Sequence, residues 1–295
     1  MHKLELDTNL SLLLAAKPVV DATITQLKND VTAWIKRGIT PSLKVLLVGQ
    51  HPASLIYTRN KKKFIESLGA KCEIIHLDEK ISKSDFLNKA QEISSDTKAH
   101  GCFVQLPLPK HLQDIDVATL FPAHKDVDGF HPENIRAMVV GGSIAGKALL
   151  PCTPKGIISL LRHYHYDLTG KNAVVIGRSM IVGKPMAMML SNANASVSIC
   201  HSKTKDISYF TKNADLIVVA VGVKDFLKPQ HLGDNKPWII DVGQNVIDDT
   251  LFGDVAQGCA ELSGAITPVP GGVGPMTICS LGENLLKAVK LGESS

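Results

Sequence analysis

Tyr57 and Lys61 are four residues apart in a segment that the sequence predicts to be helical, so both lie on one helical face. Pro52 stands where such a helix would begin. An aromatic ring beside an amine can stack on a planar substrate while the amine moves protons. An ordinary pair of surface side chains has the same spacing, so this pair alone does not establish a site.

Two other segments place polar groups where a ligand could reach them. Gln105 ends an apolar run that begins at Cys102, and ligands of open α/β sheets bind at the carboxyl ends of strands. Residues 125–130 form an acidic turn that contains Asp126 and Asp128. Turn chemistry alone would also explain that segment, and spacing does not decide which aspartate matters.

A dinucleotide-binding turn is predicted after the apolar strand at residues 173–176. Residues 177–185 occupy the place of the phosphate loop, but the glycine pattern is degenerate. Gly177 fits the first position, whereas Ser179 and Val182 stand where two further glycines are usual. Pro185 suits a first helical turn, whose free N–H groups favour an anion. A simple tight turn is the alternative.

The residues beyond this turn favour NADP over NAD. Residues 201–204 read His-Ser-Lys-Thr at the place where an NAD enzyme presents a carboxylate to the ribose. Arg178, Ser202 and Lys203 offer donors and positive charge to a 2′-phosphate instead. Further along, residues 267–277 contain three glycines and three prolines. Such a loop allows a ligand close to the backbone before the last helix.

Short apolar runs alternate with helical patterns in two series, which predicts two α/β domains with parallel strands. The series meet near Pro151, and an amphipathic helix at 276–290 follows the second one. The apolar run Leu10 to Ala16 is predicted to start a helix rather than to form a signal peptide. The predicted strands are 44–48, 72–77, 102–106, 173–176, 196–200, 216–221, 238–242 and 265–267, and the predicted helices are 53–68, 82–94, 155–164, 185–192 and 276–290.

Composition narrows the class of protein. The chain has 295 residues and a formal net charge of +4, without a dense basic stripe for nucleic acid. No run approaches the roughly 20 apolar residues of a membrane span. The six scattered cysteines are expected to be mostly buried and reduced, and the spacing of His163 and His165 argues against a metal site. We expect a cytoplasmic protein that binds neither nucleic acid nor membranes.

These segments, in this order, resemble the bifunctional methylenetetrahydrofolate dehydrogenase/methenyltetrahydrofolate cyclohydrolase family. The resemblance runs from about Pro41 to the final helix. The stretches that carry it are 52–54 with Tyr57 and Lys61, 104–109, 125–130, 151–156, 177–185 and 267–277.

The resemblance implies a role for each of these residues. Lys61 would handle protons, Gln105 would hydrogen-bond it, and Tyr57 would stack on the folate. Asp128 would hold the pterin-like ring, and Ser54 would support this catalytic group. Further substrate contacts are implied for Val104, Leu106, Pro270, Gly271, Gly272, Val273 and Gly274, and cofactor contacts for Gly177, Arg178, Ser179, Ser202 and Gln244.

The same resemblance implies an architecture and an activity. Residues 1–150, completed by a C-terminal helix at 276–295, would form a discontinuous catalytic domain. Residues 151–275 would form a Rossmann-like NADP-binding domain, with the folate in a cleft between the two. The chain would oxidise 5,10-methylenetetrahydrofolate with NADP, hydrolyse the methenyl product to 10-formyltetrahydrofolate, and form a homodimer.

Two departures from the family pattern leave alternatives open. Residues 14–18 replace the usual Asp-Gly-Lys entry, and Gln244 replaces an apolar residue beside the nicotinamide. A dehydrogenase without the cyclohydrolase step is one alternative, which the pairing of Lys61 with Gln105 disfavours. A dehydrogenase of small hydroxy acids such as shikimate, and an inactive NADP-binding module, are the others.

Overall fold

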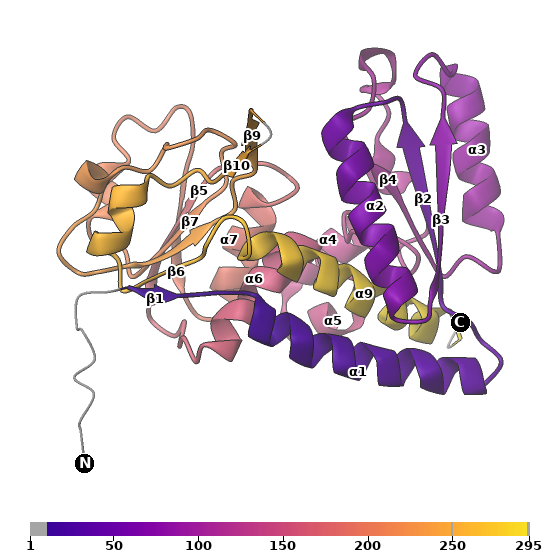
Figure 1. The fold of residues 1–295 in the computed structure, drawn as a ribbon, viewed down its shortest axis with the longest axis horizontal. Coiled ribbons are helices and arrows are strands. Elements are labelled where there is room, and N and C mark those ends of the chain that lie inside the picture. The colour runs from indigo at the N-terminus through magenta and orange to yellow at the C-terminus, as the bar shows by residue number, and fades with distance from the viewer. Residues whose placement is uncertain (1–10, 249, 294–295) are drawn as a thin grey trace. The chain divides into compact units, whose positions relative to one another are not determined.

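The computed structural model describes residues 11–248 and 250–293, which form two compact α/β units (Figure 1). Unit 1 contains residues 11–19 and 156–276 of the described chain, and unit 2 contains residues 20–155 and 277–293. Both units are built on parallel sheets. The predicted fold class, two α/β domains with parallel strands, is confirmed.

The N-terminal segment differs from the prediction. β1 (Leu12–Leu13) pairs in parallel with β11 (Ala265–Ile266), so residues 11–19 belong to unit 1 and not to the domain that carries Lys61. This strand also replaces the helix start predicted for Leu10 to Ala16, although residues 1–10 lie outside the described residues. Backbone pairing to an exposed sheet edge outweighs the local helical pattern here. The boundary between the units falls after Lys155, within the helix that follows Pro151.

Unit 2 is a three-stranded sheet of order β3-β2-β4 with helices on both faces. Strand β2 alternates between two cores: Leu43 and Val45 pack with residues of α1, α2 and α9, whereas Leu46 and Val48 pack with α3. Successive strand residues point to opposite faces, so one apolar run fills both layers. Its elements are α1 (Lys17–Lys36), β2 (Ser42–Val48), α2 (Pro52–Ser67), β3 (Lys71–Leu77), α3 (Lys83–Ser95), β4 (Gly101–Gln105), η1 (Lys110–Leu112), η2 (Val117–Thr119), α4 (Pro132–Val140), α5 (Gly142–Lys147) and α9 (Val273–Gly292).

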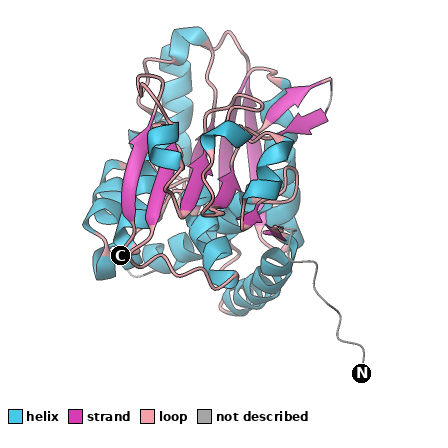
Figure 2. Ribbon diagram, turned by 90° about the vertical axis from the view of Figure 1, so that its left-hand side faces the viewer, coloured by secondary structure: helices cyan, strands magenta, loops and turns pink. Residues whose placement is uncertain are grey.

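Unit 1 is a six-stranded sheet of order β1-β11-β8-β7-β5-β6 with a separate hairpin of β9 and β10. The paired strands of the sheet are all parallel, and Figure 2 separates strands from helices by colour. Besides β1 and β11, its elements are α6 (Cys152–His163), β5 (Asn172–Ile176), α7 (Gly183–Asn192), β6 (Ser196–Cys200), α8 (Ser208–Thr211), β7 (Leu216–Val219), η3 (Pro229–His231), β8 (Trp238–Asp241), β9 (Asn245–Ile247), β10 (Thr250–Phe252) and η4 (Gln257–Leu262).

Strand β7 and helix α9 have other ends in the structure than the sequence predicted. Strand β7 ends at Val219 rather than at Val221, because the amides of residues 221–223 bind a side-chain carboxylate instead of a neighbouring strand. Helix α9 begins at Val273, so the second half of the glycine- and proline-rich loop is already helical. Pro275 is tolerated in this first turn although it has no N–H group, since the N–H groups there have no partner within the helix.

The remaining composition-based expectations concern cysteines and membranes. All six cysteines are buried and unpaired, as predicted for reduced core residues. Burial raises the pKa of the Cys102 thiol to about 12, which keeps it protonated. Within the described ranges, no helix has both the length and the apolar surface that a membrane span requires.

Candidate active site

Helix α2 carries Lys61 into a nearly closed setting in unit 2. The helix begins at Pro52, as the sequence predicts, and Lys61 is only 5% exposed. Its Nζ lies 4.9 Å from the centre of the Tyr57 ring, one helical turn earlier, and 4.1 Å from the centre of the Phe103 ring on β4. The predicted pairing of the amine with the aromatic ring is therefore present, and two ring faces contact the cation.

Gln105 fixes the orientation of this amine. It is the last residue of β4, and its Oε1 accepts a hydrogen bond from Lys61 Nζ at 3.2 Å. Its Nε2 donates to the carbonyl of Leu106 at 2.9 Å, which holds the amide with its oxygen toward the lysine. The acceptor is a neutral amide, so this hydrogen bond places no carboxylate directly against the lysine.

Asp128 and Tyr57 belong to the same group of side chains. Burial raises the pKa of Asp128, and the positive charge of Lys61 opposes that rise. Burial also raises the pKa of Tyr57, with smaller contributions from Cys152 and Asp128, while a hydrogen bond with Thr277 lowers it. Tyr57 consequently keeps its proton at neutral pH. The structure brings Tyr57, Lys61, Gln105 and Asp128 together from three separate parts of the chain.

The other residues predicted for the substrate in unit 2 flank this group. Ser54 is buried, and its Oγ donates to the carbonyl of Leu106 at 3.3 Å, which ties α2 to the end of β4. The side chain of Val104 packs into the core on the α3 face, opposite to Phe103. A substrate contact from Val104 would therefore come from its backbone.

The predicted phosphate loop lies at the carboxyl end of β5 in unit 1. Gly177 has a φ of +126°, and a Cβ there would lie 2.3 Å from the carbonyl oxygen of Ala220. Gly183 is equally constrained, since its Cβ would lie 2.2 Å from the carbonyl oxygen of Gly177. Ser179 Oγ accepts hydrogen bonds from the amides of Val182 and Gly183 at 3.1 and 3.3 Å, and so caps the start of α7.

Arg178 and Ser202 lie at the ends of two adjacent strands. Ile176 of β5 pairs with Cys200 of β6, and both polar side chains are exposed just beyond that pair. The amide of Gly177 also donates to the carbonyl of Cys200 at 2.8 Å. This arrangement fits a dinucleotide whose ribose carries an extra phosphate, because a hydroxyl donor and a guanidinium follow two adjacent strand ends, and residues 201–204 contain no carboxylate to repel the phosphate.

Gln244 and residues 270–274 are also close to each other in unit 1. They line one small cavity of about 110 Å³ together with Asp241 at the end of β8 and Leu251 of β10. A Cβ on Gly274 would lie 3.3 Å from Nε2 of Gln244, so the two are in contact distance. The polar replacement noted in the sequence therefore faces the glycine-rich loop.

Sequence reasoning missed several residues that shape these sites. Phe103 is two residues before Gln105 on one strand, and this spacing could have placed it on the lysine side of the sheet. Gly183 is six residues after Gly177, and it allows the first turn of α7 to approach the backbone of Gly177 closely. Thr277 and Asn284, both on α9, gave no sequence signal because their partners are distant in the chain.

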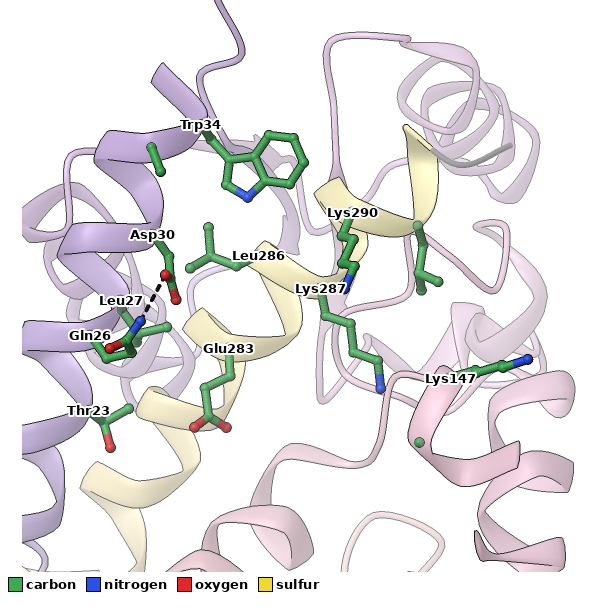
Figure 3. Close-up of a pocket in the computed structure, with 13 residues that line it drawn as sticks. Thr23, Gln26, Leu27, Asp30, Trp34, Lys147, Glu283, Leu286, Lys287 and Lys290 are labelled. Atoms are coloured by element: carbon green, nitrogen blue, oxygen red, sulfur yellow. Dashed lines mark hydrogen bonds between the residues drawn. The ribbon is translucent and has the colours of Figure 1, made fainter. Parts of the chain in front are cut away.

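A sizeable cavity in unit 2 lies away from this group of residues. A cavity of about 790 Å³ lies among α1, α5 and α9, and Figure 3 shows Trp34, Lys147 and Lys287 around it. It is lined by Thr23, Gln26, Leu27, Asp30, Ala33, Trp34, Gly146, Lys147, Glu283, Leu286, Lys287, Lys290 and Leu291. None of the residues predicted for catalysis lines this cavity, and we assign it no part in the chemistry.

Two α/β units, one with a dinucleotide-type loop and the other with an enclosed lysine, define a two-domain, dinucleotide-dependent dehydrogenase. Residues 151–293 match the NAD(P)-binding domain of tetrahydrofolate dehydrogenase/cyclohydrolase, and residues 14–128 match the catalytic domain of the same family. The chain belongs to the tetrahydrofolate dehydrogenase/cyclohydrolase family, as its motifs indicated.

Relatives agree along nearly the whole chain. The bifunctional protein FolD of Bacillus licheniformis is 44% identical over 267 residues, which cover 90% of this chain and 92% of that protein. The crystal structure of the bifunctional methylenetetrahydrofolate dehydrogenase/cyclohydrolase from Campylobacter jejuni aligns with a TM-score of 0.91 at 42% identity, covering 95% and 99% of the two chains. The enzyme from Trypanosoma brucei, solved with NADP and an inhibitor, aligns with a TM-score of 0.90 at 28% identity, covering 97% and 99%.

Proposed function

We propose that this chain catalyses two consecutive reactions on one folate. The first oxidises 5,10-methylenetetrahydrofolate to the 5,10-methenyl cation with NADP, and the second hydrolyses that cation to 10-formyltetrahydrofolate. The observation that carries the proposal is the hydrogen bond of Lys61 Nζ to Gln105 Oε1 at 3.2 Å beside the Tyr57 ring. An enclosed amine with a neutral acceptor is proton-transfer machinery that the hydrolysis needs.

The cofactor would be held by the carboxyl ends of β5 and β6 in unit 1. Gly177 would let the pyrophosphate approach the backbone, and the first turn of α7 would face it with a helix dipole. Arg178 and Ser202 would bind the 2′-phosphate, and Gln244 would lie at the nicotinamide side. NADP is favoured over NAD because residues 201–204 carry no carboxylate. The bound cofactor supplies a hydride acceptor.

The folate would be held mainly by unit 2. Tyr57 would stack on its planar ring, and the carboxyl group of Asp128 would accept hydrogen bonds from N–H groups of the pterin. Ser54, Leu106 and the backbone of Val104 would line the same place. Pro270, Gly271, Gly272, Val273 and Gly274 of unit 1 would offer close backbone approach to the folate.

The hydrolysis requires Lys61 as the neutral amine: a water oxygen forms a bond to the methenyl carbon, and one water proton passes to the lone pair of Nζ. The adduct then collapses: its hydroxyl proton leaves as the C=O bond forms, the bond from that carbon to N5 breaks, and N5 takes up a proton. The other proton goes to solvent, so the reaction releases one proton overall. Gln105 keeps the amine aimed at the reacting carbon, since its own amide is fixed by Leu106.

We further propose that the protein works in the cytoplasm as a homodimer joined through unit 1. Six free cysteines suit a reducing compartment. The β9–β10 hairpin exposes Val246 and Ile247 with 62% and 44% of their surface accessible. Apolar side chains on a short hairpin with open edges are a natural surface for self-association.

Activity measurements with Lys61→Ala test the proposed function. Wild-type protein should turn over 5,10-methylenetetrahydrofolate with NADP. The absorbance of the reduced cofactor and of the methenyl product measures this turnover. Cyclohydrolase activity should fall by at least about 100-fold in Lys61→Ala, since general acid–base groups contribute that much. Lys63→Ala is the matched control, because Lys63 is exposed on the same helix.

The outcomes separate the parts of this proposal. Absence of turnover with either cofactor would refute the enzyme and favour an inactive binding module. Oxidation without hydrolysis in the wild type would favour a dehydrogenase of single activity. A preference for NAD would overturn the argument from Arg178 and Ser202 and leave the rest intact.

A further inference from the structure

Asp254 is a fully buried carboxylate, with 0% exposure, that receives four hydrogen bonds within unit 1. Its Oδ2 accepts from the amides of Val221 and Gly222 at 2.7 and 2.9 Å. Its Oδ1 accepts from the amide of Val223 and from Asn245 Nδ2, both at 2.9 Å. We propose that Asp254 is a positioning residue for the nicotinamide dinucleotide; this inference rests on the proposed function.

The loop that Asp254 holds is in direct contact with the predicted phosphate turn. Ala220, one residue before the three bound amides, donates from its amide to the carbonyl of Ile176 at 2.8 Å. A Cβ on Gly177 would lie only 2.3 Å from the carbonyl oxygen of Ala220. A displacement of residues 221–223 would therefore shift the neighbouring Ala220 carbonyl, which packs against the turn at Gly177.

The same carboxylate also fixes the segment that carries Gln244. Gly243 and Asn245 flank this residue, and a Cβ on Gly243 would lie 2.3 Å from Asp254 Oδ1. Asn245 reaches the same oxygen through its side chain. The side chain of Asp254 thus joins the backbone that follows β7 to the backbone that follows β8. Both segments lie at the carboxyl ends of the strands, where the cofactor would bind.

Asp254 is itself held in place and does not face a ligand. Its amide donates to Asp241 Oδ1 at 2.8 Å, the amide of Val255 donates to Asp241 Oδ2 at 3.0 Å, and Asp241 is the last residue of β8. Among the described residues, every buried side-chain nitrogen or oxygen has a hydrogen-bond partner. The carboxylate of Asp254 is therefore committed to the loops, and its influence on the cofactor passes through them.

The substitution Asp254→Asn tests this role. It replaces one carboxylate oxygen by an NH₂ group. This group cannot accept a hydrogen bond from a backbone N–H, so at least one buried N–H loses its acceptor. The control is Asp215→Asn, the same chemical change at the amino end of β5 and β7, where the carboxylate accepts from the amide of Asn172 at 2.8 Å. A second variant, Asn245→Ala, removes one neutral partner of Asp254 and carries the test if Asp254→Asn does not fold.

Three measurements read the effect. NADPH fluorescence gives the affinity of each variant for the cofactor. A cyclohydrolase assay without cofactor reports on the folate site, and hydrogen exchange of residues 221–223 is measured on the cofactor-free protein. We expect Asp254→Asn to weaken NADPH binding by about tenfold or more, and Asn245→Ala to weaken it by about threefold. Both variants should exchange the amide hydrogens of residues 221–223 faster and keep a cyclohydrolase activity near that of the wild type. Asp215→Asn should resemble the wild type in all three measurements.

Unchanged NADPH affinity in a folded Asp254→Asn protein would overturn the inference. So would an equal loss in Asp215→Asn, or a parallel loss of cyclohydrolase activity, since either would mean a general structural effect. A wild type that binds NADPH but does not oxidise the folate would refute the proposed function alone, and the binding comparison would still decide the role of Asp254. A wild type that binds neither reduced dinucleotide would refute both.

Discussion

Replacing Asn284 by leucine should destabilise unit 2 and displace the segment that precedes Asp128. Asn284 lies on α9 and is 1% exposed. Its Nδ2 donates to the carbonyls of Val127 and Leu150 at 2.9 and 2.8 Å, and its Oδ1 accepts from Lys155 Nζ at 2.9 Å. Leucine has nearly the same volume but makes none of these bonds.

The magnitude follows from what each partner keeps. Val127 retains a bond from the thiol of Cys152 at 3.2 Å, and Lys155 retains its ion pair with Glu283 at 2.8 Å. Leu150 loses a buried side-chain donor, and an unsatisfied buried group costs about 1–3 kcal/mol. With a smaller contribution from the weakened Val127 contact, we expect a loss of about 2–4 kcal/mol in the free energy of unfolding of unit 2.

The chain has two tryptophans, Trp34 in unit 2 and Trp238 in unit 1, which allows the units to be followed separately. In a Trp238→Phe background, urea unfolding monitored by fluorescence reports on Trp34, which packs against the core of unit 2. The unfolding midpoint should fall for Asn284→Leu without a change in slope. We also expect a higher KM for the folate, because Asp128 directly follows Val127.

The control is Asn88→Leu, the same substitution at an exposed position of α3 in the same unit. It should change the free energy of unfolding by no more than about 0.5 kcal/mol, as is usual for surface positions. A loss of that small size in Asn284→Leu would contradict the hydrogen-bond accounting. An unchanged midpoint read through Trp34 would place any effect of the substitution outside unit 2.

Two further predictions concern pH and assembly. Burial raises the pKa of Asp126 from 3.8 to about 6, so its contribution to stability is present below about pH 4 and is lost as pH rises through 6, by about 3 kcal/mol at most. Calorimetry should therefore find a flatter dependence on pH over this range in Asp126→Asn, and an identical slope would exclude the effect. Val246→Lys should convert a wild-type dimer into a monomer in light scattering; a monomeric wild type would refute the proposed interface on β9.

Local patterns predicted most of what lies close together in the chain. The spacing of Tyr57 and Lys61, the strand that ends at Gln105 and the turn at Gly177 were all readable, because helix and strand periods fix which side chains share a face. Residues 11–19 make their contacts with unit 1, since the pairing of Leu12–Leu13 with β11 joins segments more than 250 residues apart. No local pattern encodes such a pairing.

The sequence by itself therefore determined the family, the two series of alternating strands and helices, and the residues able to move protons or approach phosphate. Tertiary structure distinguished the two nearby aspartates, because Asp126 accepts from the amides of Gly129 and His131 while Asp128 lies near Lys61. It also brought Asn284 and Asp254 to the backbone groups of the loops that they hydrogen-bond. Their partners are backbone groups, which every residue carries, so residue types reveal nothing until the chain has folded and the donors and acceptors meet.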